Sequence, residues 1–173
     1  MSLNLRVRRL GEADQSFVSH LDCGSARFER DVAKYLREWI WEEGEEKVRQ
    51  RSQTLLGYDA ESGSLVGYGT WDYIEELGGQ AAETHLEVAW FGLDKAFQGQ
   101  RDETSGEKLA DLLYSTLEDD ARASLKTSDD MPFTLACDVE NQRGRYFWER
   151  HGYRLIGPPY PEVEDARYYR MVR

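Results

Sequence analysis

The sequence predicts an α/β protein in which helices pack on one mixed sheet. Three observations predict this class. Several short segments have the apolar pattern of strands, and one longer segment, residues 28–41, carries apolar residues at helical spacing. In addition, a strand, a polar loop and an amphipathic helix follow one another over residues 86–117. The 173 residues suit a single domain, 1–173, with no repeat or linker to divide it.

The first half of the chain predicts three strands and two helical segments. The helix over 28–41 is expected to end at the acidic run 42–46, and the polar segment 75–83 is expected to be a loop. The other expected elements, in chain order, are a strand at 5–10, a short helical piece at 17–21, and strands at 54–59 and 65–71 joined by a hairpin turn at 60–64.

The second half predicts the rest of the sheet and two further helices. In the helix after the polar loop, one side carries Leu109, Leu112, Leu113 and Leu117. The expected elements are strands at 86–93, 133–139, 153–156 and 168–172, helices from 109 through 121 and over 141–151, a loop at 127–130, and an extended link that contains Pro158, Pro159 and Pro161.

Composition narrows the classes of function. A hydrophobic fraction of 40% supports a real core, no apolar run approaches the roughly 20 residues of a membrane helix, and the N-terminus lacks a long apolar signal segment, so a cytoplasmic location is expected. The two cysteines and three histidines are scattered, which predicts reduced thiols and no metal site. The net charge of −11 argues against a nucleic-acid surface and would suit a cationic partner, or it only keeps the protein dissolved.

The polar loop at 98–106 lies between a strand and a helix start. Loop peptide groups and the first turn of a helix carry unpaired N–H groups, and the helix dipole favours an anion there. Phosphate-bearing cofactors bind at such places. The alternative is an ordinary polar connection in which Gly99 and Gly106 are turn residues.

A second segment gives this loop a context. In residues 141–153, Asn141 is followed by Gly144, the aromatic pair 147–148 and Gly152-Tyr153. Together with the strand–loop–helix, this segment resembles the GNAT superfamily of acyl-CoA-dependent N-acetyltransferases. The resemblance implies a mostly antiparallel central sheet of about seven strands flanked by helices, acetyl-CoA as cosubstrate, an amine acceptor and a possible homodimer.

The resemblance also implies which residues hold the cofactor. The family's loop pattern, Gln/Arg-x-x-Gly-x-Gly/Ala, fits in two ways, so the loop is expected to be about four residues longer than usual. Asp102 and Glu103 are expected to point outward, because carboxylates repel a diphosphate. The residues expected to bind the cofactor are Gln98, Gly99 and Gln100 at the loop opening, Arg101, Thr104, Ser105 and Gly106 towards the helix, the backbone amides of Phe91 and Leu93, and the side chains of Asn141 and Trp148.

Two of these cofactor residues have alternative roles. Asn141 is also a good helix N-cap, and both roles can hold together. Trp148 occupies the place where many relatives have the tyrosine that protonates the leaving thiolate. Because an indole cannot serve as an acid, Trp148 is expected either to wall the thioester pocket or to pack in the core.

The chemistry of amine acetylation suggests two catalytic candidates. Glu87 is the acidic side chain of the strand 86–93 and is the candidate general base, acting through a water. The alternative is a structural carboxylate that is hydrogen-bonded to the neighbouring strand, for example by Tyr68 or Trp71. Tyr146 or another tyrosine could be the acid, or solvent could protonate the thiolate. Cys23 and Cys137 are not expected to be nucleophiles, because attack in this family is usually direct.

The acceptor side is less defined by the sequence. Aromatic residues near it could offer apolar or cation–π surface to an amine, or could belong to the core. They are Trp39, Trp41, Trp71 and Tyr73. The predicted activity is transfer of acetyl from acetyl-CoA to a primary amine, and the alternative is a non-catalytic acyl-CoA-binding domain. Both depend on a V-shaped gap beside Leu93.

Overall fold

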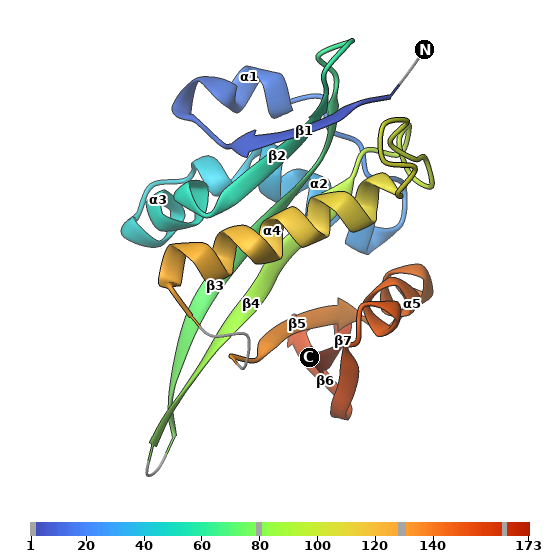
Figure 1. Ribbon diagram of the computed structural model, residues 1–173. Coiled ribbons are helices and arrows are strands. Elements are labelled where there is room, and N and C mark those ends of the chain that lie inside the picture. Colours follow the sequence, from blue (N-terminus) through green and yellow to red (C-terminus); the bar gives the residue numbers. More distant parts are fainter. Residues whose placement is uncertain (1–2, 79–80, 128–130, 164–165) are drawn as a thin grey trace. The chain divides into compact units, whose positions relative to one another are not determined.

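Seven strands form one sheet in the order β1-β2-β3-β4-β5-β7-β6 (Figure 1). The structure, a computed structural model, describes residues 3–78, 81–127, 131–163 and 166–173. The strands are β1 (Leu5–Arg9), β2 (Thr54–Asp59), β3 (Leu65–Gly78), β4 (Ala81–Leu93), β5 (Phe133–Asp138), β6 (Arg154–Val163) and β7 (Ala166–Val172). The helices are α1 (Gln15–Val18), α2 (Arg27–Arg37), α3 (Glu45–Ser52), α4 (Leu109–Leu125) and α5 (Gln142–Arg150), with 3-10 turns η1 (Glu12–Asp14) and η2 (Trp39–Trp41).

The pairing of the strands is mixed. β4 and β5 run parallel, whereas β1–β2, β2–β3, β5–β7 and β6–β7 are antiparallel. The predicted fold class, a mostly antiparallel sheet of about seven strands flanked by helices, is confirmed.

Internal contacts divide the chain into two compact units. The first comprises residues 1–71 and 90–125, and the second comprises residues 72–89 and 126–173. β3 and β4 each pass through both units. The one-domain organisation of the chain stays a prediction.

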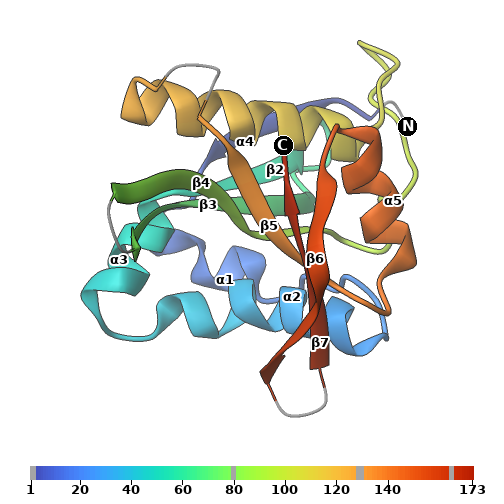
Figure 2. The ribbon, with the colours of Figure 1, turned by 90° about the horizontal axis from the view of Figure 1, so that it is seen from below.

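The first unit has helices on both faces of its strands (Figure 2). On one face, the buried residues Leu109 and Leu113 of α4 pack with Val66 and Leu93. On the other face, residues of α1 and α2 form a core with Leu56 and Tyr68 of the sheet. The amphipathic helix that the leucine pattern predicts is therefore α4, and its apolar side covers the sheet.

The second unit contains β5, β7, β6 and α5. Its core includes the fully buried side chains of Phe133 and Met171. Trp148 of α5 is also buried, and its ring packs 5.6 Å from that of Tyr153. The predicted extended link that carries three prolines is part of β6, whose register with β7 is irregular between Ile156 and Val163.

Two predictions about the helices are corrected. The helix expected over 28–41 stops at Arg37, because Glu38 leaves the helical conformation (φ −128°, ψ −66°), and a 3-10 turn follows. The acidic run 42–46 does not only end a helix, since α3 begins at Glu45. The acidic residues of α3 lie in its first turn and the basic residues lie in its last turn, which is the arrangement that the helix dipole favours.

The segment 75–83, predicted as a loop, is strand wherever the structure describes it, and residues 79–80 lie outside the described residues. β3 continues to Gly78 and β4 begins at Ala81, so the two strands extend well beyond their apolar parts. In the described parts of the chain, none of the helices combines the length with the apolar character that a bilayer crossing requires.

The turn between β2 and β3 is held by Asp59, which makes the unfolding of the protein sensitive to acid. The carboxylate of Asp59 accepts hydrogen bonds from the Ser62 hydroxyl (2.6 Å), the Asn4 N–H (3.1 Å) and the Ser62 N–H (3.0 Å). These bonds, that of the Ser62 hydroxyl foremost, lower the pKa of Asp59 to about 2. An unfolded chain has an aspartate pKa of roughly 3.9.

We therefore expect Asp59 to stabilise the protein above about pH 4, and this contribution to disappear as the pH falls from about 4 through about 2. The measurement is urea unfolding at a series of pH values for the wild type and for Asp59→Asn. The wild type should lose more stability than Asp59→Asn in this window, and equal slopes would contradict the prediction.

Candidate active site

The end of β4 is the first part of the candidate site. Phe91 packs against Tyr114 of α4 and Leu93 belongs to the same core, whereas Trp90, on the other face, stacks on Tyr35 of α2. The side chains at this strand end are therefore fixed by packing, and the backbone is the part that remains to interact with a ligand.

The backbone of β4 approaches β3 closely at this point. A Cβ atom on Gly67 would lie 2.4 Å from the Gly92 carbonyl oxygen and 2.9 Å from the Leu93 Cα. The Asp94 N–H donates to the Val66 carbonyl (2.8 Å). Since N–H groups alternate in direction along a strand, the N–H of Leu93 is directed to the opposite edge of β4, and continued alternation gives the same direction for Phe91.

The opposite edge of β4 carries a parallel ladder with β5. The ladder joins Leu86–Val88 to Phe133–Leu135, and β4 itself continues to Leu93. The predicted gap beside Leu93 concerns how the two units are placed, and it stays a prediction.

The loop that follows β4 is the second part of the candidate site. Gly99 has a φ of 81°, a conformation that glycine adopts without strain. The Gln98 side chain does not project from this loop. Its Nε2 donates to the Cys23 carbonyl (2.7 Å) and, at the longer distance of 3.3 Å, to the Leu93 carbonyl.

Residues 102–107 form a small hairpin between this loop opening and α4. An isolated bridge between Arg101 and Lys108 closes the hairpin. Around the bridge, the Asp102 N–H donates to the Glu107 carbonyl (2.9 Å), and the Leu109 N–H donates to the Gln100 carbonyl (3.1 Å). The extra residues of this loop, which let the family pattern fit in two ways, therefore form a hairpin outside the direct path from Gln100 to α4.

The expectation that Asp102 points outward is wrong. Its side chain is buried, and the carboxylate accepts the Leu5 N–H (2.8 Å), the Ser105 N–H (2.8 Å) and the Ser105 hydroxyl (3.0 Å). These bonds, that of Leu5 foremost, lower the pKa of Asp102. Asp102 therefore holds the hairpin to β1, whereas Glu103 is exposed as predicted.

The hydrogen bonds of the hairpin bear on the predicted cofactor residues Thr104, Ser105 and Gly106. The Ser105 N–H donates to the Asp102 carboxylate, the Gly106 N–H to the Asp102 carbonyl (2.8 Å), and the Thr104 N–H also bonds to that carboxylate. The Arg101 guanidinium donates to the Gly106 carbonyl (2.7 Å). These N–H groups are not unpaired donors as predicted, so a diphosphate could use them only after the hairpin changes its hydrogen bonds.

Glu87 lies in the second unit, opposite Thr134 of β5, and is partly buried. The two donors suggested for a structural role are engaged elsewhere. The Tyr68 hydroxyl donates to the Val32 carbonyl (2.6 Å), and the Trp71 indole donates to Asp120 (2.9 Å). That form of the structural alternative is wrong, and the role of Glu87 as base stays a prediction.

Helix α5 places the other predicted residues of this unit. The Asn141 side chain caps the helix by accepting the Gly144 N–H (2.7 Å), so the capping role is confirmed. Trp148 is 7% exposed and packs against Phe147 and Tyr153, as a core residue does. The Tyr146 side chain is 69% exposed, and its role as an acid stays a prediction.

The cap gives a prediction about stability. Asn141→Ala removes the acceptor for the Gly144 N–H and is expected to lower the free energy of unfolding by about 1 kcal/mol. Asn141→Asp keeps a cap acceptor and should lose much less. Chemical denaturation of the three proteins tests this, and equal losses in both variants would rule out the cap as the cause.

The cysteines are poor nucleophiles, as expected. Cys23 and Cys137 are both buried, and burial is the main cause that raises the pKa of each thiol to about 12. In the described residues, histidine, cysteine and carboxylate side chains do not form a group of three that could hold a metal ion.

The aromatic residues proposed for the acceptor side are largely engaged by the protein itself. Lys34 lies 5.2 Å from the centre of the Trp39 ring, and the Arg51 guanidinium lies 6.0 Å from that of Trp41. Trp71 is buried, and Tyr73 is partly buried in the other unit. These rings therefore offer an incoming amine less cation–π surface than the sequence suggests.

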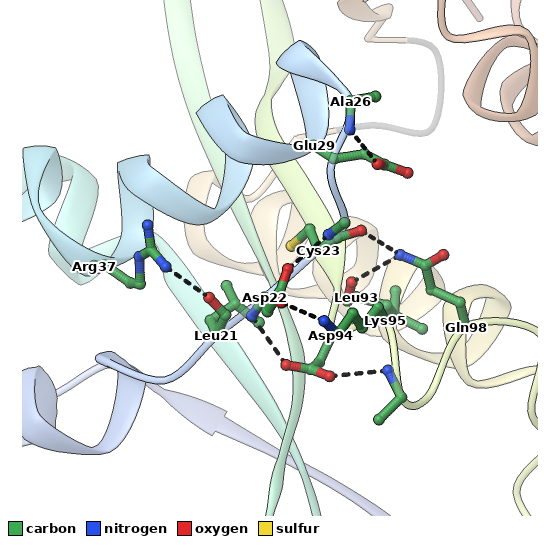
Figure 3. Close-up of polar contacts among 12 residues, drawn as sticks. Leu21, Asp22, Cys23, Ala26, Glu29, Arg37, Leu93, Asp94, Lys95 and Gln98 are labelled. Atoms are coloured by element: carbon green, nitrogen blue, oxygen red, sulfur yellow. Dashed lines mark hydrogen bonds and ion pairs between the residues drawn. The ribbon is translucent and has the colours of Figure 1, made fainter.

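Sequence reasoning missed Asp22, Lys95 and the inward role of Gln98. These residues join the segment before α2 to the end of β4 (Figure 3). Asp22 and Lys95 are far apart in the chain and carry no motif. A sequence signal for Gln98 existed only in the loop pattern, which does not tell where its side chain points.

Comparison with known proteins adds evidence about the fold. Neither a protein family model nor a curated protein matches the sequence. Solved structures match over nearly the whole chain. Naa50 of Arabidopsis thaliana, in complex with the bisubstrate analogue CoA-Ac-MVNAL, has a TM-score of 0.64 at 10% identity, with 99% of this chain and 99% of that chain covered.

Two further structures agree. Naa20 of Chaetomium thermophilum, in complex with a bisubstrate analogue, has a TM-score of 0.63 at 14% identity and covers 97% of this chain and 85% of that chain. Ard1 from Thermoplasma volcanium has a TM-score of 0.61 at 15% identity, with 99% and 97% covered. At these identities the likeness shows the fold, so the chain has the fold of the GNAT acetyltransferases that the sequence resemblance implies.

Proposed function

We propose that this protein is an N-acetyltransferase that transfers the acetyl group of acetyl-CoA directly to a primary amine. The observation that carries the proposal is the shared fold, which covers nearly the whole chain and whose examples include structures holding CoA or a CoA bisubstrate analogue. Fold alone does not fix function. The end of β4 at Leu93, followed by a loop and a helix start, adds the local order of elements that such a cofactor needs.

In this proposal the backbone at Phe91 and Leu93 binds the pantetheine arm and the thioester carbonyl. Donors fixed in place where negative charge develops lower the barrier of acyl transfer. The strand end fits this role because packing on α4 and the close contact with Gly67 hold it. Gln100, Gly99 and the start of α4 would face the diphosphate, and Asn141 and Trp148 stay candidates for cofactor contact from the sequence resemblance.

Glu87 is the proposed general base, which takes the proton from the amine through a water. Trp148 is buried and cannot donate a proton, and the proposal gives the acid role to Tyr146 or to solvent. Solvent suffices because a free thiol has a pKa of roughly 8.5, so the departing thiolate is only weakly basic.

The first acceptors to test are peptides with a free N-terminus. Several proteins of this fold were captured with peptides or peptide-bearing analogues, including the NatC complex with a Gag peptide and Naa50 with CoA-Ac-MVNAL. The net charge of −11 would attract a cationic acceptor at long range. A homodimer also remains part of the proposal.

A non-catalytic acyl-CoA-binding domain is the second candidate. The buried tryptophan at position 148 favours it, because many relatives carry at that position the tyrosine that protonates the leaving thiolate. The two candidates share cofactor binding and differ only in turnover.

The experiment has two stages. Acetyl-CoA is expected to raise the melting temperature, and free thiol is expected to appear when a panel of peptides and small amines is added. Stabilisation without thiol release from any amine would favour the binding domain. The enzyme proposal fails if acetyl-CoA neither stabilises the protein nor is consumed.

A further inference from the structure

The side-chain amide of Gln98 links two backbone segments of the first unit. Its Nε2 donates to the carbonyl of Cys23, just before α2, and to the carbonyl of Leu93, the last residue of β4 (Figure 3). The loop position assigned to the cofactor by the sequence pattern thus points its side chain at the protein.

An ion pair and three further hydrogen bonds support the same junction. The Lys95 ammonium lies 2.6 Å from the Asp22 carboxylate, and the Lys95 N–H donates to the Asp22 carbonyl (2.7 Å). In return, the Asp22 N–H donates to the Asp94 carboxylate (3.0 Å), and the Gly24 N–H donates to that of Asp22 (3.0 Å). The segment before α2 and the end of β4 are therefore held in one arrangement.

Gln98 also helps to fix the orientation of the peptide group between Leu93 and Asp94. Between Leu93 and Asp94, the N–H donates to Val66 (2.8 Å) and the carbonyl accepts from Gln98 (3.3 Å). With both polar groups bonded, this peptide cannot rotate without losing a hydrogen bond. The orientation of the Leu93 residue, and hence of its own N–H, depends on that peptide.

We propose that Gln98 is a positioning residue for the pantetheine and thioester half of acetyl-CoA, acting through the Leu93 and Cys23 carbonyls without contact to the cofactor. This inference rests on the proposed function. Donors are effective when a supporting shell holds them within a fraction of an ångström of the productive place. The Gln98 amide supplies that support to the end of β4, while the phosphate half of the cofactor does not depend on it.

The test compares two ligands, acetyl-CoA and adenosine 3′,5′-bisphosphate, which has the phosphates but no pantetheine. Gln98→Leu removes the donor and is expected to weaken acetyl-CoA binding by about 5- to 10-fold, the worth of roughly one hydrogen bond. The affinity of Gln98→Leu for the bisphosphate should stay within about twofold of the wild-type value, because the Gln98 hydrogen bonds support only the part of the site that binds pantetheine. Gln98→Arg, which can donate to both carbonyls, should restore most of the acetyl-CoA affinity.

Titration calorimetry on the full chain measures the affinity of each protein for the two ligands, and Gln15→Leu, at an exposed position in α1, is the control for the same substitution elsewhere. Equal losses for both ligands, or no loss for either, would overturn the inference. If Gln98→Leu does not fold, Gln98→Glu, which keeps the size but presents an acceptor, makes the same comparison. A wild type that binds neither ligand would instead overturn the proposed function.

Discussion

Replacing Glu87 by glutamine is expected to lower the rate of acetyl transfer by about 100-fold, at the lower end of the range for loss of a general base. The variant keeps the size of the side chain and removes its ability to take a proton. Affinity for acetyl-CoA should change by less than about twofold, because a base that acts on the amine contributes little to holding the cofactor.

Two of the donors considered for a structural role of Glu87 are bonded elsewhere. If Tyr68 or Trp71 bonded Glu87, the carboxylate would belong to the sheet. Both donors are used inside the first unit instead, on Val32 and Asp120. Glu87 itself is partly buried opposite Thr134, and its role as the base stays a prediction.

Turnover is measured by thiol release with the best acceptor of the panel, and binding by calorimetry with acetyl-CoA. Glu61→Gln, an exposed position in the turn between β2 and β3, is the matched control and should leave both unchanged. A fully active Glu87→Gln protein would dismiss Glu87 as the base. A variant that loses cofactor affinity and rate together would point to a structural role.

Local patterns were sufficient for most of the sheet. The strand predicted at 54–59 is β2 with the same bounds, and the leucines that predict the helix after the polar loop are the residues by which α4 packs on the sheet. In both cases the burial that shapes the element also selects apolar residues at a regular period, so the sequence carries the information directly.

The elements that were missed lack that kind of signal. α3 is a polar helix with a single buried residue, Gln50, which the Tyr35 hydroxyl hydrogen-bonds (2.8 Å). In the segment 75–83, β3 continues to Gly78 and β4 begins at Ala81, and because the sequence there is largely polar, a hydrophobicity pattern does not report these strand ends. The charges at the two ends of α3 were the one usable signal for it.

The loop of the candidate site was predictable from the sequence, and its hydrogen bonds were not. Residue patterns placed a loop before α4 correctly. They could not show that Asp102 turns inward, since its partner, the Leu5 N–H, lies 97 residues away in the chain. The direction of the Gln98 side chain was missed for the same reason, because its partner, the Cys23 carbonyl, lies in the distant segment before α2. Tertiary contacts decide which loop donors remain for a ligand.

The close approach of β3 and β4 leads to the second large effect. Gly67→Ala is expected to lower the free energy of unfolding by about 2–3 kcal/mol, since a Cβ there meets backbone atoms, the Gly92 oxygen at 2.4 Å and the Leu93 Cα at 2.9 Å. Backbone cannot move aside as the end of a flexible side chain can. The strands must separate, and the separation displaces the strand end that the proposed function gives to acetyl-CoA.

Gly11→Ala is the matched control, because the nearest atom to its added Cβ is at 3.5 Å and its φ of −111° suits any residue. Chemical denaturation gives the stability, and the melting-temperature shift with acetyl-CoA gives the binding. Replacing glycine by alanine inside a strand should by itself stabilise by about 0.5–1 kcal/mol, because the unfolded chain loses freedom. A net loss at Gly67 can therefore come only from the contact with β4. A Gly67→Ala protein as stable as Gly11→Ala would mean that the two strands are not in that contact.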